Sequence, residues 1–98
     1  MQEYTKINNL NDEQLTVELK VPQMGEGLRE VRVVKLLKQE GEVIKEDEII
    51  YEMETEKSLV EIESPYNGHI EKWFAKEGDM LEVGSVLGII KLPKNSKP

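Results

Sequence analysis

The sequence predicts an all-β fold, a flattened barrel or sandwich built from two quasi-symmetric four-stranded halves. Short runs of alternating apolar and polar residues recur along the 98-residue chain, and glycine-containing turns separate them. No segment of normal helix length has an apolar stripe with the helical period of about 3.6 residues. A stretch of seven residues near residue 40 recurs 37 residues later, and such repeats are usually architectural.

The strands are predicted wherever this alternation holds. In the first of them, Val17, Leu19 and Val21 alternate with charged residues, which is the pattern of a strand with one buried face. The later segments are mostly short and are bounded by glycines or polar breaks. The predicted strands cover residues 17–21, 31–37, 43–44, 49–53, 60–62, 70–74, 80–81 and 86–90.

The repeat relates residues 38–44 (Lys-Gln-Glu-Gly-Glu-Val-Ile) to residues 75–81 (Ala-Lys-Glu-Gly-Asp-Met-Leu). The same shift aligns Val33 with Ile70. One half of about four strands cannot cover its own apolar face, so we expect each half to bury that face on the other.

The predicted domain occupies residues 16–91. Residues 1–15 are expected to be a flexible lead-in, with room for a short helical turn near Asn11. Residues 92–98 are expected to be a linker or tail, because Pro93 and Pro98 cannot donate to a sheet.

The predicted domain carries the whole net charge of the chain. Residues 16–91 contain 17 acidic and 10 basic side chains, which accounts for the charge of −7. Nucleic acid and anionic membranes need a basic face, so we expect neither as a partner. Cysteine is absent and histidine occurs once, so we expect no metal site. Residues 1–10 lack the apolar stretch of a signal peptide, so a cytoplasmic location is expected, or the mitochondrial matrix for a processed eukaryotic chain.

Lys57 gives the clearest functional signal. Two alternating segments flank Thr55-Glu56-Lys57-Ser58, and a four-residue polar break between such segments predicts a hairpin turn. In the two-part scheme this hairpin joins the halves, so we expect Lys57 at a tip with its amine in water. A solvated lysine is mostly protonated near neutral pH and is a poor nucleophile. Its chemical use is then as an attachment point for another enzyme to modify, although an ordinary polar turn residue fits the same pattern.

Five short motifs accompany this turn in a fixed order. They are Pro22-Gln-Met-Gly-Glu-Gly27, Gly41-Glu-Val43, Glu54-Thr-Glu-Lys-Ser58, Glu61-Ile-Glu-Ser-Pro-Tyr-Asn-Gly68 and Gly78-Asp79. In this order and at these spacings they resemble the biotinyl/lipoyl attachment domain family, and the resemblance covers residues 15–92. Biotin acceptors of the family resemble Met-Lys-Met and lipoyl acceptors Asp-Lys-Ala. Glu56-Lys57-Ser58 is similar to the second type, because glutamate keeps the charge of aspartate and serine is about the size of alanine.

The resemblance implies a barrel-sandwich hybrid that carries lipoate covalently on Lys57. The lipoyl-lysine would be a swinging arm that shuttles acyl groups between the active sites of a 2-oxoacid dehydrogenase complex. The implied partners are a lipoate-attaching enzyme, a thiamine-diphosphate-dependent 2-oxoacid decarboxylase, an acyltransferase catalytic domain and dihydrolipoamide dehydrogenase. The domain itself would be a monomer without catalytic residues, because the cofactor carries the reactive atoms.

The resemblance also implies residues that partners recognise. In the family, the loop that holds Gly25 and Gly27 lies near the lipoyl-lysine and helps the decarboxylase to recognise its own carrier. Turn geometry is the other interpretation of these two glycines, and a turn or close packing is the simpler one for Gly68. The full set of implied recognition residues is Glu56, Ser58, Gly25, Glu26, Gly27 and Gly68.

Two other functions stay open at this point. A biotin carrier and an unmodified interaction module of the same fold both fit the predicted strands, and intact mass distinguishes the three. A glycine-cleavage carrier is a variant of the lipoyl carrier, but glycine-cleavage carriers are usually longer and have extra helices. The lysines and prolines after Leu92 suggest a severed linker, which leaves open whether the chain is part of a larger acyltransferase.

Overall fold

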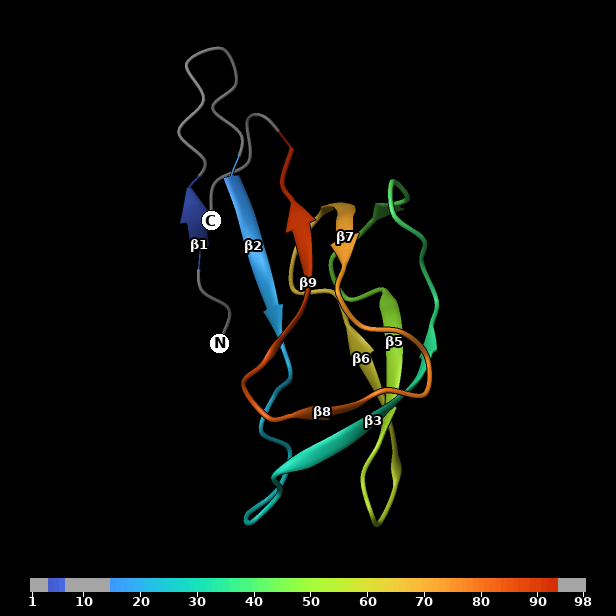
Figure 1. Cartoon of the computed structure of the whole chain (residues 1–98). Coiled ribbons are helices and arrows are strands. Elements are labelled where there is room, and N and C mark those ends of the chain that lie inside the picture. Colours follow the sequence, from blue (N-terminus) through green and yellow to red (C-terminus); the bar gives the residue numbers. More distant parts are fainter. Residues whose placement is uncertain (1–3, 7–14, 94–98) are drawn as a thin grey trace.

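The computed structural model describes residues 4–6 and 15–93, and this part of the chain contains strands and turns but no helix (Figure 1). The predicted all-β class is confirmed, and each of the eight predicted strands has a counterpart in β2 to β9. The strands are β1 (Tyr4–Lys6), β2 (Leu15–Lys20), β3 (Glu30–Leu36), β4 (Val43–Ile44), β5 (Ile49–Glu54), β6 (Leu59–Glu63), β7 (Gly68–Trp73), β8 (Met80–Glu82) and β9 (Val86–Lys91).

The strands form two antiparallel sheets around one core. The sheets have the orders β1-β2-β9-β7-β4 and β6-β5-β3-β8, so each has four strands when β1 is set aside. The sequence repeat relates β3, β4 and β5 to β7, β8 and β9. Each sheet therefore takes strands from both repeats, and the halves cover each other by exchanging strands rather than by stacking as separate layers.

The repeat extends to individual hydrogen bonds. The Gly41 N–H donates to the Ile70 carbonyl at 2.7 Å, and 37 residues later the Gly78 N–H donates to the Val33 carbonyl at 2.7 Å. Gly41 and Gly78 have φ angles of 90° and 95°, which explains why both copies of the turn contain glycine. The carboxylate that follows each glycine also accepts a backbone hydrogen bond: Glu42 accepts from the Gln39 N–H at 2.7 Å, and Asp79 accepts from the Lys76 N–H at 2.8 Å.

The core is apolar and takes side chains from both sheets. Tyr51 and Trp73 meet edge to face, with ring centroids 6.1 Å apart, and Trp73 also donates from its indole nitrogen to the Lys38 carbonyl at 2.8 Å. These contacts tie β7 to β5 and to the segment that follows β3. The buried apolar residues are Val17, Leu19, Val21, Val31, Val33, Ile44, Ile50, Tyr51, Met53, Ile70, Ala75, Leu87, Ile90 and Leu92.

Three details differ from the sequence-based expectation. Strand β1 pairs with β2 inside the segment expected to be a lead-in, while Asn11 lies outside the described residues. Leu92 belongs to the expected tail but is buried. In β5 the pairing register shifts between Ile49 and Tyr51, so that Ile50 and Tyr51 are both buried despite being neighbours.

Two glycines allow the strands of the first sheet to approach closely. A Cβ atom on Gly68 would collide with the Lys91 carbonyl oxygen and would lie 3.2 Å from the Ile90 side chain. A Cβ atom on Gly88 would lie 2.8 Å from the Lys72 carbonyl oxygen. Both positions therefore need glycine for packing, which is the simpler of the two interpretations given above for Gly68.

We expect Gly68→Ala to lower the free energy of unfolding by about 1–3 kcal/mol, because backbone must move to accept the methyl group. Gly25→Ala is a matched control, since Gly25 has no positive φ and a Cβ atom there would have no neighbour within 4 Å. Its effect should stay within about 0.5 kcal/mol. Urea unfolding measures both variants, and equal midpoints would contradict the packing role of Gly68.

An ion pair fixes the connection around β4. The Lys38 ammonium lies 2.8 Å from the Glu48 carboxylate. Hydrogen bonds from Lys38 and from the Lys45 backbone N–H lower the pKa of Glu48 below its ordinary value. The hydrogen bond to Glu48 raises the pKa of Lys38 in turn.

Acid should weaken the fold in part through Glu48. Because its pKa is lower in the folded chain, its contribution is complete above the ordinary value of 4.5 and is lost as the pH falls through the folded pKa. We expect the wild type to lose more stability than Glu48→Gln between about pH 7 and about pH 3. Urea midpoints across this range measure the difference, and parallel curves for the two proteins would refute it.

Candidate functional site

The hairpin between β5 and β6 holds Lys57 on a turn built around the side chain of Thr55. The Thr55 N–H donates to the Ser58 carbonyl at 2.9 Å. The Thr55 hydroxyl accepts hydrogen bonds from the backbone N–H groups of Lys57 and Ser58, both at 3.2 Å, and lies 3.3 Å from the Ser58 carbonyl, to which it donates. One hydroxyl thus uses its donor and both acceptor positions on this turn.

Lys57 is exposed at the apex, as are its neighbours Glu56 and Ser58. Among the residues that the structure describes, none forms an ion pair with Lys57. Neither Glu56 nor Lys57 has a positive φ, so the turn places no backbone strain on the lysine. The hairpin tip lies at one end of the molecule, and the start of β2 and the end of β9 lie at the other (Figure 1).

The loop of residues 21–29 lies beside this hairpin. Leu28 donates its backbone N–H to the Gly25 carbonyl at 3.1 Å, and Gly27 has a φ of 79°, as the third residue of a type II turn requires. The loop has nine residues between β2 and β3, whereas the symmetry-related connection between β6 and β7 has four. The two halves therefore differ most where the longer loop reaches the lysine turn.

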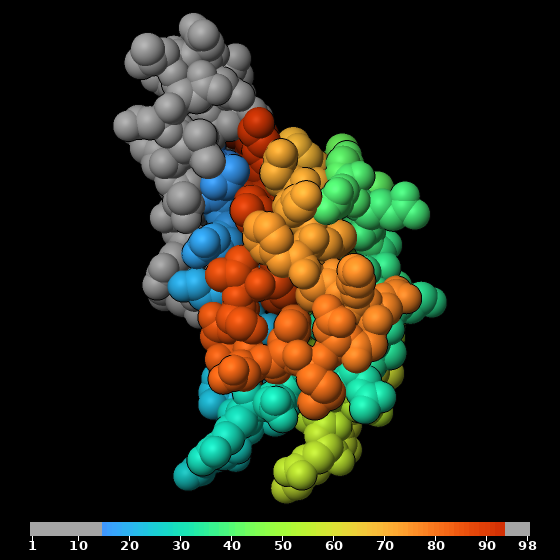
Figure 2. Space-filling model, in the orientation of Figure 1, coloured from blue at the N-terminus to red at the C-terminus, as the bar shows by residue number. Residues whose placement is uncertain are grey.

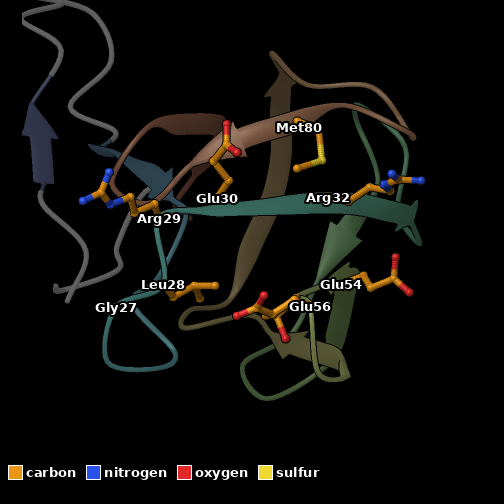
Figure 3. A pocket seen from close by; sticks show the side chains of 9 residues that line it. Gly27, Leu28, Arg29, Glu30, Arg32, Glu54, Glu56 and Met80 are labelled. Carbon is orange, nitrogen blue, oxygen red and sulfur yellow. The ribbon is translucent and has the colours of Figure 1, made fainter.

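Two grooves separate the loop from the hairpin, and Figure 2 shows the hollow between the two projections. The lysine groove has a volume of about 420 Å³ and is lined by Met24, Gly25, Glu26, Gly27, Leu28, Thr55, Glu56, Lys57 and Ser58. The arginine groove has a volume of about 400 Å³ and is lined by Gly27, Leu28, Arg29, Glu30, Arg32, Glu54, Thr55, Glu56 and Met80. Figure 3 shows the arginine groove, with Leu28 on the loop side and Glu56 on the hairpin side.

The structure brings most of the sequence-predicted site residues to one place. The lysine groove is lined by Gly25, Glu26, Gly27, Glu56, Lys57 and Ser58. Gly68 is separate from them: it opens β7, pairs with Ile44 and lines neither groove. The positive φ of Gly27 accounts for that glycine by turn geometry, whereas no backbone angle or close contact accounts for Gly25.

Sequence reasoning missed the role of Thr55 and the lining residues Met24 and Leu28. A threonine that precedes a polar pair in a tight turn is a known signal for side-chain to backbone hydrogen bonds, so Thr55 could have been found. Nothing in the local pattern placed Met24 or Leu28 opposite a hairpin 30 residues away in the chain.

Other kinds of site find no support in residues 4–6 and 15–93. Their His, Asp and Glu side chains form no group of three that could hold a metal ion. The same residues include no helix of the length and apolarity needed to cross a membrane.

Comparison with known proteins agrees with this fold. The biotin/lipoyl family model, described as "Biotin-requiring enzyme", matches residues 17–90. The succinyltransferase component (dihydrolipoyllysine-residue type) of the 2-oxoglutarate dehydrogenase complex of Bartonella vinsonii subsp. berkhoffii is 42% identical over 77 residues, which are 79% of this chain and 19% of that protein. The acetyltransferase component of the pyruvate dehydrogenase complex of Staphylococcus aureus strain Mu50 is 37% identical over 79 residues, 81% of this chain and 18% of that protein.

The chain thus spans about a fifth of the length of the curated relatives it matches. Among solved structures, the lipoyl domain of the 2-oxoglutarate dehydrogenase complex from Azotobacter vinelandii matches with a TM-score of 0.65 and 32% identity. That match covers 74% of this chain and 92% of that domain. The chain therefore belongs to the biotinyl/lipoyl attachment family and has the fold of a lipoyl domain.

Proposed function

We propose that this chain carries lipoate on Lys57 and serves as the swinging-arm carrier of a 2-oxoacid dehydrogenase complex. The observation that carries the proposal is that Lys57 is exposed at the apex of a hairpin and has no ion-pair partner among the described residues. The side chain of Thr55 holds the backbone of this hairpin through hydrogen bonds. The relatives named above are components of such complexes, and the Glu56-Lys57-Ser58 context is of the lipoyl type.

The residues of the turn fit a covalently attached lipoyl group. The amine that forms the amide bond with lipoate must reach the active site of the attaching enzyme. No carboxylate among the described residues forms an ion pair with Lys57, so none has to be released first. Amide formation removes one positive charge, so modification makes the net charge one unit more negative than −7. When bound, lipoate supplies a disulfide that can be reduced and reoxidised as acyl groups are carried.

The contribution of the protein is to position and tether the arm. A hairpin with a fixed backbone presents the lysine in one geometry, which reduces the ordering cost of docking to a partner. Tethering converts each delivery into an intramolecular event at high effective concentration. The domain performs no bond-making step of its own in this proposal, and the chemistry belongs to its partners.

The proposed partners are those of the complex. They are a lipoate-attaching enzyme, a thiamine-diphosphate-dependent 2-oxoacid decarboxylase, an acyltransferase catalytic domain and dihydrolipoamide dehydrogenase. The proposed location is the cytoplasm, or the mitochondrial matrix for a processed eukaryotic chain.

The position of the lysine should decide modification. Exchanging Lys57→Ser with Ser58→Lys moves the amine one residue along the turn, from the apex toward the start of β6 at Leu59, while Thr55 still holds the backbone of both positions. We expect intact mass after co-expression with a lipoate-attaching enzyme to show a lipoyl addition on the wild type and none on the exchanged variant. Lys45→Arg, which alters an exposed lysine beside another turn, should keep the addition. A biotinyl addition on the wild type, or complete lipoylation of the exchanged variant, would overturn the proposal.

The hydroxyl of Thr55 should matter for both stability and modification. Thr55→Val removes the acceptor for two backbone N–H groups and should cost ~1 kcal/mol of unfolding free energy. It should also slow lipoylation in a timed mass assay, whereas Thr55→Ser, which keeps a hydroxyl, should be modified at nearly the wild-type rate. Equal rates for valine and serine at this position would show that the hydroxyl has no part in presenting Lys57.

A further inference from the structure

We propose that the lysine groove is a docking site for the lipoyl group of the same chain, so that the arm rests against the loop instead of standing free in water. This inference rests on the proposed attachment of lipoate to Lys57. It adds a binding site on the carrier itself, made by Met24, Gly25 and Leu28.

The point of attachment is part of the groove. Lys57 is one of the nine residues that line it, so a group attached to the lysine begins at the groove's edge. A tethered ligand has a high effective concentration at a site within its reach, and weak contacts are then enough to hold it. The groove volume of about 420 Å³ falls in the range of small-molecule sites.

The loop side of the groove suits a neutral, apolar group that contains sulfur. Met24 is 49% exposed on a domain whose surface is rich in acids, and Leu28 is half-buried beside it. A methionine side chain is flexible and polarisable, and it adapts to irregular apolar shapes. The alkyl chain and dithiolane of a lipoyl group would cover this apolar surface, which otherwise faces water.

Gly25 gives the second observation. Its φ is not in the left-handed region, and a Cβ atom placed on it would meet no heavy atom within 4 Å. Neither the turn nor the packing of the domain therefore requires glycine here, in contrast to Gly27, whose φ is 79°. Because Gly25 lines the groove and the space around its Cβ position is empty within 4 Å, we infer that the glycine leaves room there for a ligand.

The arginine groove is a poorer match for the same group. Lys57 does not line it, and five of its nine lining residues are charged. In the lysine groove, Glu26, Glu56 and Lys57 are the charged residues, and the amide bond removes the charge of the lysine. Only the lysine groove includes the point of attachment, and it has fewer charged lining residues than the arginine groove. Both differences favour the lysine groove as the site for the lipoyl group.

Nuclear magnetic resonance of the ¹⁵N-labelled full chain tests the docking directly. Intact mass first establishes that Lys57 is lipoylated, and a protein that cannot be lipoylated would overturn the proposed function together with this inference. We expect lipoylation to change the backbone amide chemical shifts of Met24, Gly25 and Leu28, as well as those of the turn, relative to the unmodified protein. We also expect nuclear Overhauser contacts between the lipoyl methylenes and the methyl groups of Met24 and Leu28.

Filling the groove should remove these signals. Gly25→Val places a branched side chain in the open space, and its unmodified spectrum shows whether the fold is retained. In the lipoylated variant the loop shifts and the contacts to Met24 should be lost, while the shifts of residues 56–58 remain. Wild-type shifts that are confined to residues 55–58, with no contact to Met24 or Leu28, would overturn the docking site and leave the proposed function intact.

Discussion

Neither half of this chain can bury its apolar face alone, and the rest of the structure depends on how that constraint is met. The two repeats exchange strands, so that β4 lies beside β7 and β8 beside β3. The same pair of hydrogen bonds closes each exchange, through Gly41 in one copy and Gly78 in the other. With the body closed in this way, the β5–β6 hairpin is free to project, and its tip carries the only lysine with the lipoyl-type flanking residues.

The functional end of the molecule arises where the symmetry is broken. The connection after β2 is longer than its counterpart after β6, and the additional residues lie against the lysine turn. A strictly symmetric domain would have a bare hairpin with no neighbouring loop. The longer connection provides the turn with a groove and with side chains that differ from those of the hairpin. Whatever distinguishes this carrier from others of its fold is therefore expected in this loop rather than in the shared strands.

Much of the fold followed from local pattern, because alternation and turn glycines act over a few residues. The strands that flank Gly41 and Gly78 and the position of Lys57 on a hairpin were predictable for this reason. The burial of Ile50 beside Tyr51 was not, since a shift of register breaks the alternation without a mark in the sequence. Close packing was one expectation for Gly68, but the strand against which it packs could not be named, and the groove beside Lys57 was not expected. Both depend on segments that are distant in the chain, and no local signal encodes such a meeting.

The lysine turn and the strand ends at Leu15 and Lys91 lie at opposite poles of the domain. Anything joined to the ends of the domain is therefore attached at the pole opposite the lysine turn. Because the body of the domain separates the two poles, a small rotation about the strand ends at Leu15 and Lys91 moves the lysine turn through a larger distance. For a group carried on Lys57 as proposed, the search radius would combine the arm, the body of the domain and any segment joined to its ends, and the folded body would add its length without a further cost in conformational entropy.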